Sequence, residues 1–247
     1  MKRLGLIGYP LEHSFSPAYF RKKFRKENVQ ATYELFPLKH INEFPELIES
    51  QPGLDGLNVT IPYKQKIIPY LHFISDEAKA IGAVNTLKIE HKSRPVLTGY
   101  NTDVVGLQNT IQELIQSKPD VQALVLGTGG ASVSVQFVLT KLRIPFTLVS
   151  RKAKPKSLNY HQIDREIMNH YHLVINTTPL GMYPGIEEFP PLPYDAITSK
   201  HIFYDLIYNP EKTLFLKKAE AKGASIMNGL KMLEIQAEAS WRIWNEE

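Results

Sequence analysis

Leu124-Val125-Leu126-Gly127-Thr128-Gly129-Gly130-Ala131-Ser132 is the stretch of this chain that decides its fold. A nearly continuous apolar run from Val121 leads into it, and an apolar stretch of helical length, Val133 to Leu142, leads out of it. Glycines where a strand passes into a helix let backbone amides approach a pyrophosphate without interference from Cβ atoms. With a further strand expected at 146–149, the pattern predicts a strand-helix-strand unit of a doubly wound α/β sheet that binds a dinucleotide. A plain tight turn is the alternative interpretation.

The residues after the next strand indicate which dinucleotide to expect. A site for the ribose hydroxyls of NAD usually has Asp or Glu about 20 residues beyond the glycines. This chain has Ser150-Arg151-Lys152 there, followed by Lys154 and Lys156. A guanidinium group backed by ammonium groups suits a 2′-phosphate. The sequence therefore predicts NADP as the cofactor, with a solvated basic loop as the alternative.

Strands and helices alternate on both sides of this unit. Before it we expect strands at 4–8, 32–36, 56–61, 86–90 and 95–99, and helices from Ser16 through Phe24 and at 44–50, 64–71 and 76–81. Around and after it we expect a helix at 104–116, strands at 121–126, 173–176 and 202–206, and a long amphipathic helix at 230–244. This order is typical of an α/β protein.

Composition excludes several classes of protein. The chain has 247 residues, 43% of them hydrophobic, and no cysteine, which excludes disulfides and thiolate metal sites. Neither an export signal nor an apolar run long enough to span a membrane is present, so we expect a cytoplasmic protein. His161, His170 and His172 lack companions at metal-ligand spacing, so no metal is expected. The net charge of +4 comes without a nucleic-acid-reading motif, so phosphorylated small molecules are the expected partners.

Asn58-Val59-Thr60-Ile61-Pro62-Tyr63-Lys64 ends an apolar strand with polar side chains and then a lysine. In an extended strand Asn58 and Thr60 share one face. Pro62 suits a first helical position, which would place Lys64 in the opening turn of a helix, where the helix dipole disfavours a cation. A lysine in such a place is suited to proton transfer.

Four further polar residues are candidates for the site, and three of them have a simpler explanation. Ser14 and Ser16 flank Phe15 and would face the same way in an extended segment, but Ser16 before Pro17 is also a natural N-cap. Asp103 precedes a helix and is equally well explained as a cap, and Asn85 as a turn residue. Taken as a set with Lys64 and a dinucleotide unit, they suit reduction of a ketone to a secondary alcohol, in which a Lys and Asp pair handles the proton.

Eight stretches in order resemble the shikimate dehydrogenase family over almost the whole chain. They are Gly8 to Pro10 with His13 to Pro17, Asn58 to Lys64, Gly82 to Thr86, Gly99 to Asp103, Gly127 to Ser132, Asn176 to Pro179, Tyr204 to Leu206 with Tyr208, and Gly229 to Gln236. The family reduces 3-dehydroshikimate to shikimate with NADPH, on the route to chorismate and the aromatic amino acids. The resemblance implies a fold of two α/β domains. An N-terminal substrate-binding domain with a mixed, mainly parallel sheet (1–102 plus 230–247) and a Rossmann-like NADP-binding domain (103–229) would enclose the active-site cleft.

Carried over position by position, the resemblance implies a role for each matching residue. Lys64 and Asp103 would be the catalytic pair. The expected substrate contacts are Ser14, Ser16, Thr60, Asn85, Tyr208 and Gln236. The expected cofactor contacts are Gly127, Gly129, Gly130 and Ala131 at the pyrophosphate, Ser150, Arg151 and Lys152 at the 2′-phosphate, Thr177, Leu206, Gly229 and Met232 at the nicotinamide side, and Asp76.

Two other functions stay open at this level. One is a relative that acts on quinate or shikimate with NAD, and Arg151 argues against it. The other is a catalytically silent dinucleotide sensor on the same fold, which the presence of both Lys64 and Asp103 disfavours. The expected assembly is a monomer or a homodimer.

Overall fold

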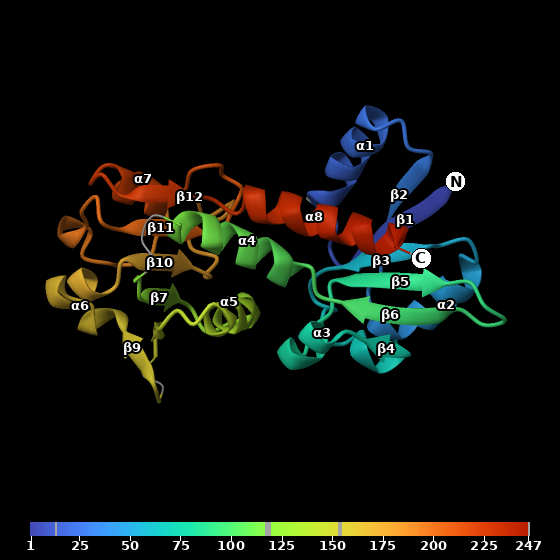
Figure 1. Cartoon of the computed structure of the whole chain (residues 1–247), viewed down its shortest axis with the longest axis horizontal. Helices are drawn as coiled ribbons and strands as arrows, with labels where there is room; N and C mark the ends of the chain where they lie inside the picture. The colour runs from blue at the N-terminus through green and yellow to red at the C-terminus, as the bar shows by residue number, and fades with distance from the viewer. Residues whose placement is uncertain (13, 117–119, 153–154, 247) are drawn as a thin grey trace. The chain divides into compact units, whose positions relative to one another are not determined.

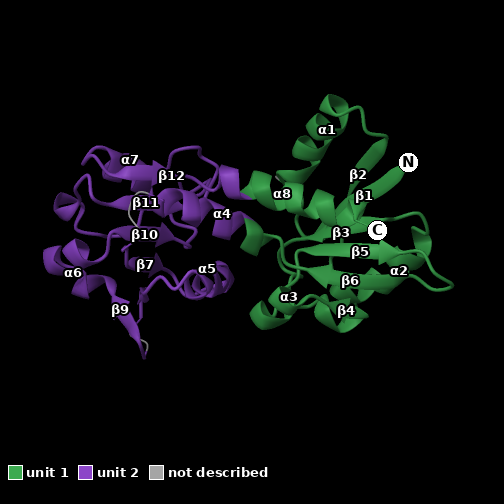
Figure 2. Cartoon of the chain, in the orientation of Figure 1, with its two compact units in different colours: residues 1–105, 233–247 green, residues 106–232 purple. Residues whose placement is uncertain are grey.

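The computed structural model describes residues 1–12, 14–116, 120–152 and 155–246. The chain divides into two compact units, the first made of residues 1–105 and 233–247 and the second of residues 106–232 (Figure 2). Both boundaries fall inside helices, α4 (Asp103–Ile115) and α8 (Leu230–Asn245). The sequence-based boundaries of 102/103 and 229/230 lie at the starts of these two helices.

The first unit is built on a mixed six-stranded sheet in the order β2-β1-β3-β5-β6-β4 (Figure 1). The strands are β1 (Lys2–Gly8), β2 (Ala31–Pro37), β3 (Gly56–Val59), β4 (Phe73–Ile74), β5 (Thr86–Glu90) and β6 (Val96–Tyr100). β1 pairs in parallel with β2 and β3, whereas β5 is antiparallel to both β3 and β6. The helices of this unit are α1 (Ser16–Lys26), α2 (Phe44–Ser50), α3 (Asp76–Ile81) and the C-terminal part of α8, with 3-10 turns at Ile41–Glu43 and Ile68–Tyr70.

An aromatic cluster attaches α1 and α8 to this sheet. The Phe20 and Tyr33 rings stack with centroids 4.6 Å apart, and Trp244 of α8 lies 5.5 Å from Phe20. Trp244 Nε1 donates to the Leu87 carbonyl at 2.9 Å, and a Cβ on Gly56 would lie 2.2 Å from that same nitrogen. Only glycine at position 56 therefore lets α8 approach the sheet this closely.

The second unit is a parallel sheet of six strands in the order β12-β11-β10-β7-β8-β9. The strands are β7 (Ala123–Leu126), β8 (Phe146–Ser150), β9 (Ser157–Asn159), β10 (Leu173–Asn176), β11 (Ile202–Asp205) and β12 (Ser225–Met227). Its helices are α4, α5 (Gly130–Lys141), α6 (Arg165–His170) and α7 (Leu214–Glu220), with 3-10 turns at Tyr160–Gln162 and Tyr194–Ala196. All four residues of β7, β10 and β11 are buried, as expected for central parallel strands.

The strand order of the second unit is that of the doubly wound dinucleotide fold, which confirms the predicted fold class. The order reverses between β7 and β10, which are neighbours in the sheet although β8 and β9 lie between them in sequence. In open α/β sheets ligands bind at such a reversal, beyond the carboxyl ends of the strands. Gly127 and Thr177 follow directly after β7 and β10, so the predicted cofactor residues begin where this rule places a ligand.

The helix predicted over 64–71 is wrong. Turns occupy residues 61–62 and 64–67, and only Ile68–Tyr70 forms a 3-10 turn. Pro69 explains the difference, because it cannot donate a backbone hydrogen bond and disfavours helical geometry at the residue before it. Strands β4, β9 and β12 and helices α6 and α7 were not predicted from the sequence, since they are too short to carry a clear periodicity.

No helix in the described ranges combines the length and the apolar character that crossing a membrane requires.

Candidate active site

Lys64 and Asp103 form an ion pair, with 2.7 Å between Nζ and Oδ2. The Lys64 side chain is 34% exposed and that of Asp103 is 14% exposed. The backbone carbonyl of Lys64 accepts a hydrogen bond from Val84 N at 2.7 Å, which holds the turn that carries the lysine against the entry to β5. Two residues 39 positions apart are thus brought together where both side chains are partly buried. An ammonium group has three N–H donors, so Lys64 can donate to a ligand while it bonds Asp103.

The predicted reason for the properties of Lys64 needs correction. Lys64 lies in a turn, so it does not occupy the opening turn of a helix as predicted. The charge that faces its ammonium group is the Asp103 carboxylate, from the first residue of α4.

Capping does not account for Asp103. The backbone N–H of Val104 donates to Asn101 Oδ1 at 3.4 Å, and Asn101 Nδ2 donates to the Ala83 carbonyl at 2.9 Å. Asn101 thus provides a side-chain acceptor at the start of α4, and the Asp103 carboxylate bonds to Lys64.

The capping interpretation of Ser16 is also wrong. Ser16 is the first helical residue of α1, and Phe15 occupies the N-cap position without a side-chain cap. Burial raises the pKa of the Tyr33 phenol, and the Ser16 hydroxyl acts to lower it. Ser14 lies just before α1, and its N–H donates to the Leu11 carbonyl at 3.1 Å. Thr60 directly follows β3 and donates from its N–H to the Ile7 carbonyl at 2.9 Å.

Asn85 and Gln236 are buried in contact with each other. Asn85 Nδ2 donates to Gln236 Oε1 at 3.4 Å and to Thr102 Oγ1 at 3.0 Å, and Asn85 Oδ1 accepts from Thr102 N at 2.7 Å. Asn85 is 3% exposed and Gln236 is 6% exposed. An ordinary turn asparagine would be solvated, so the turn interpretation of Asn85 is wrong.

Sequence reasoning assigned no role to the polar residues on which this pair rests. They are Tyr33, Asn58, Thr86, Thr102 and Ser240, all buried in the first unit. The available signal was weak: Asn58 is a polar residue inside an apolar strand, and Gln236 and Ser240 are four apart on one face of a helix.

The glycine turn of the second unit has the form that a phosphate requires. Gly127 has φ of +108°, and a Cβ there would lie 2.7 Å from Thr177 Oγ1. A Cβ on Gly129 or Gly130 would meet no atom within 4 Å, so open space lies over both. Gly129 caps α5 with no side-chain hydrogen bond. The turn therefore presents exposed backbone at the start of a helix of 12 residues, which fits a pyrophosphate.

The basic residues follow β8 as predicted. Ser150 is the last residue of that strand and is buried, and Arg151 and Lys152 are exposed. The Arg151 carbonyl accepts from Asn159 Nδ2 at 3.1 Å. Lys154, like His13 of the first matching stretch, lies outside the described residues.

The predicted nicotinamide-side residues lie in two places of the second unit. A Cβ on Gly229 would lie 2.1 Å from the Leu206 carbonyl, so the segment before α8 packs tightly on the residue after β11. Met232 is in the first turns of α8, where a Cβ on Gly106 of α4 would lie 2.6 Å from its carbonyl. Burial raises the pKa of Tyr208 in the same loop.

Asp76 is exposed in the first turn of α3, in the first unit, with Ser75 capping that helix. Its carboxylate is favourably placed there by the helix dipole alone.

Asp205 is a further functional candidate that the sequence did not single out. It ends β11 with no exposed surface. Its carboxylate accepts from Thr213 Oγ1 at 2.6 Å, Asn176 Nδ2 at 3.1 Å and Ile207 N at 3.1 Å. Burial raises the pKa of this carboxyl to about 6, against the three hydrogen bonds, which act to lower it. Asp205 thus ties together the segments that follow β10 and β11.

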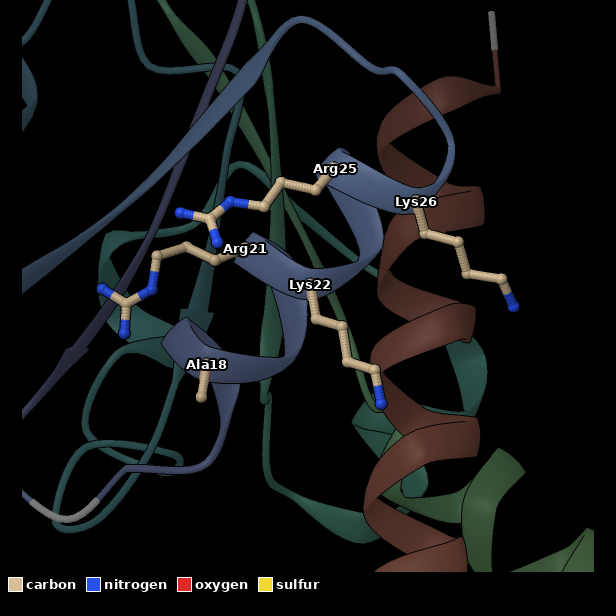
Figure 3. Close-up of a pocket in the computed structure, with 5 residues that line it drawn as sticks. All are labelled: Ala18, Arg21, Lys22, Arg25 and Lys26. Carbon is tan, nitrogen blue, oxygen red and sulfur yellow. The ribbon is translucent and has the colours of Figure 1, made fainter.

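A hollow of about 510 Å³ lies along α1, and none of the residues predicted to bind substrate or cofactor lines it. It is lined by Ala18, Arg21, Lys22, Arg25 and Lys26, and Figure 3 shows the two arginines on one side of the helix and the two lysines on the other. Within the described part of the chain, no cluster of three or more His, Asp or Glu side chains has the arrangement of a metal site.

Comparison with known proteins agrees with this geometry. Residues 6–87 match the family model of the shikimate dehydrogenase substrate binding domain. The shikimate dehydrogenase (NADP(+)) of Methanococcus aeolicus is 37% identical, over 98% of this chain and 91% of that protein. The Thermus thermophilus shikimate 5-dehydrogenase solved with NADP(H) and shikimate has a TM-score of 0.82 at 29% identity, covering 99% of this chain and 92% of that one. A Corynebacterium glutamicum quinate dehydrogenase solved with NAD has a TM-score of 0.86 at 25% identity, covering 98% and 93%. On its sequence identity over nearly its whole length, the chain belongs to the shikimate dehydrogenase family.

Proposed function

We propose that this protein catalyses the reversible, NADPH-dependent reduction of 3-dehydroshikimate to shikimate. The observation that carries the proposal is the ion pair of Lys64 and Asp103 at 2.7 Å, in the same unit as Ser14, Ser16, Thr60, Asn85 and Gln236. Ketone reduction adds a hydride to carbon and a proton to oxygen, and NADPH supplies the hydride when bound.

The protein's own contribution is to position the ketone and to handle the proton. Lys64 Nζ donates one hydrogen bond to Asp103 and has further protons to direct at a substrate oxygen. Asp103 holds the ammonium group in place and stabilises its positive charge. In the reductive direction we assign to this pair the proton transfer to the developing alkoxide, and in the oxidative direction its recovery.

Recognition of the substrate is assigned to neutral polar groups. Hydroxyls of Ser14, Ser16 and Thr60 suit the carboxylate and hydroxyls of the substrate, as do the amides of Asn85 and Gln236. Tyr208 is the proposed contact from the second unit.

The proposed cofactor residues fit NADP because of the shape of the glycine turn and the charge of the loop after β8. Open space over Gly129 and Gly130 leaves room for a pyrophosphate, and the exposed Arg151 and Lys152 suit a 2′-phosphate. Ser150, Ala131, Thr177, Leu206, Gly229 and Met232 complete the proposed set. Asp76 belongs to it by resemblance alone.

The test combines two substrates with two cofactors. Shikimate and quinate are each offered with NADP and NAD, and formation of the reduced cofactor is followed by absorbance. The proposal expects shikimate with NADP to give the highest kcat/KM. If quinate with NAD is preferred, the second candidate, a quinate dehydrogenase, replaces it; the close structural likeness to the quinate dehydrogenase keeps that candidate in view. If the protein binds NADPH and reduces nothing, it is a dinucleotide sensor.

We also make a proposal for the location and the assembly of the protein. We expect a cytoplasmic enzyme that is a monomer or a homodimer, and sedimentation of the purified protein distinguishes the two assemblies.

A further inference from the structure

A continuous network of buried, uncharged polar side chains runs through the first unit. Its members are Tyr33 on β2, Asn58 on β3, Asn85 and Thr86 at the start of β5, Thr102 before α4, and Gln236 and Ser240 on α8. Each is at most 8% exposed, and Thr86 and Ser240 have no exposed surface. Burying seven polar side chains together is unfavourable unless every one finds partners, so such a network usually has a specific use.

One end of the network has a defined direction of hydrogen bonding because it includes a backbone carbonyl. Asn58 Nδ2 donates to the Asn85 carbonyl at 3.2 Å, and a carbonyl is only an acceptor. The same nitrogen reaches Ser240 Oγ at 3.0 Å, so the NH2 group of Asn58 faces α8. Its Oδ1 therefore faces Tyr33 and accepts the phenol proton at 2.7 Å.

The other end is defined by a backbone N–H. Thr102 N donates to Asn85 Oδ1 at 2.7 Å, and a backbone N–H is only a donor. The NH2 group of Asn85 must then face Gln236, whose Oε1 accepts from it at 3.4 Å and from Thr102 Oγ1 at 3.3 Å. The oxygen of Gln236 is thus engaged inside the network, and its NH2 group is the half of the amide left for a ligand.

Ser240 joins the two ends. Its Oγ lies 3.0 Å from Asn58 Nδ2, 2.8 Å from Thr86 Oγ1 and 3.1 Å from Thr102 Oγ1. It also donates to the Gln236 carbonyl one turn earlier on α8, at 3.0 Å. A single hydroxyl thereby couples the helix that carries Gln236 to the strands that carry Tyr33 and Asn58.

We propose that Tyr33, Asn58 and Ser240 are positioning residues of the substrate site, which through this network hold the Gln236 amide so that its NH2 group is left as a hydrogen-bond donor for a ligand. The inference rests on the proposed function, because Gln236 is one of its proposed substrate contacts. The ligand oxygens that this NH2 group suits are those of a carboxylate or a hydroxyl.

The test uses two matched substitutions of buried tyrosines. Tyr33→Phe removes the hydroxyl that bonds Asn58. Tyr204→Phe removes an equally buried hydroxyl of the second unit, which bonds Thr110 Oγ1 at 3.0 Å. We expect both to unfold at lower urea concentration, but only Tyr33→Phe to raise KM for shikimate, by about five- to tenfold, with kcat and KM for NADP within about twofold of wild type.

A double-mutant cycle separates positioning from general stability. If Tyr33 acts through Gln236, Tyr33→Phe has no further effect on KM for shikimate in a Gln236→Ala background. Ser240→Ala, a second variant with a minimal change in volume, is expected to raise KM for shikimate and to show the same non-additivity with Gln236→Ala. Near-ultraviolet circular dichroism of each variant establishes that it is folded.

Three results would overturn the inference. Tyr33→Phe and Ser240→Ala could leave KM for shikimate unchanged while lowering stability like Tyr204→Phe, which would make the network purely structural. Additive effects in both cycles would exclude action through Gln236. A wild-type protein that oxidises no shikimate would instead remove the proposed function, and the substrate-positioning role with it, so the two failures are distinguishable.

Discussion

The two units prepare their proposed binding sites in opposite ways. In the first unit proposed catalytic and substrate residues are bonded to one another: Lys64 to Asp103, and Asn85 to Gln236. In the second unit the proposed phosphate residues Gly129, Gly130, Arg151 and Lys152 are exposed, with open space over the glycines. Preorganised neutral groups discriminate by geometry, whereas exposed cations attract any anion. We therefore expect the shape of the first unit to decide which substrate binds, and the charge of the second unit to decide which cofactor binds.

The largest effect should come from the charged pair of the first unit, Lys64 and Asp103. Lys64→Ala is expected to lower kcat for shikimate oxidation by roughly two to four orders of magnitude, because it removes the proposed proton-transfer group. NADPH affinity, measured by fluorescence titration, should stay unchanged, since the glycine turn belongs to the other unit. Lys66→Ala, which removes an exposed lysine two residues on, is the control and should retain full activity. Turnover within about tenfold of wild type in Lys64→Ala would contradict the assigned role.

The units should also differ in how their buried polar groups respond to pH. The first unit's network is uncharged, whereas the second unit buries Asp205, whose pKa is raised by burial to about 6 from the ordinary 3.8. The folded state then holds the proton more tightly than the unfolded chain, so this carboxyl lowers the free energy of unfolding as pH rises from 3.8 to about 6. Over that whole pH range the free energy of unfolding falls by about 3 kcal/mol.

Urea unfolding at a series of pH values checks this difference. Wild type should gain stability relative to Asp205→Asn as pH falls from about 7 to about 4, with no further change in the difference above pH 7. Ser240→Ala, the matched loss of a buried polar group in the first unit, should differ from wild type by the same amount at every pH. A constant difference for Asp205→Asn as well would show that the carboxyl titrates alike in the folded and unfolded states.

If charge decides which cofactor binds, substitution of Arg151 should have a smaller effect, and one confined to NADP. Arg151→Gln should raise KM for NADP by about tenfold and leave KM for NAD within about twofold, because only NADP carries the 2′-phosphate. Kinetics with both cofactors at saturating shikimate measure it. Arg165→Gln, an exposed arginine at the start of α6, is the control and should change neither constant. An equal rise in both constants would instead place Arg151 at a part that the two dinucleotides share.

The sequence predicts the second unit's site better than the first, for a physical reason. β7, the glycine turn and α5 are consecutive, so their strand-to-helix junction is visible in a short window. The network of the first unit joins Asn58 to Ser240 across 182 positions, and no local pattern reports such a contact. The same limit explains the errors at Ser16 and Asp103. A polar residue at a helix start is locally best explained as a cap, and only the folded chain shows that Ser16 is not at the N-cap position and that Asp103 pairs with Lys64.

Raising the ionic strength should have the smallest effect of these changes, and it should affect KM for NADP more than KM for shikimate. Salt screens exposed charges strongly, since the Debye length falls from about 10 Å at 0.1 M to about 3 Å at 1 M. KM for NADP is therefore expected to rise several-fold over this range, and KM for shikimate to change less, because its proposed contacts are neutral side chains apart from the Lys64 and Asp103 pair. Steady-state kinetics at stepped concentrations of a chloride salt measure both constants. An equal rise for shikimate would mean that exposed cations also attract the substrate. The hollow along α1 offers the nearest ones in sequence to Ser16, at Arg21 and Lys22, and an Arg21→Gln, Lys22→Gln variant would then remove that salt dependence.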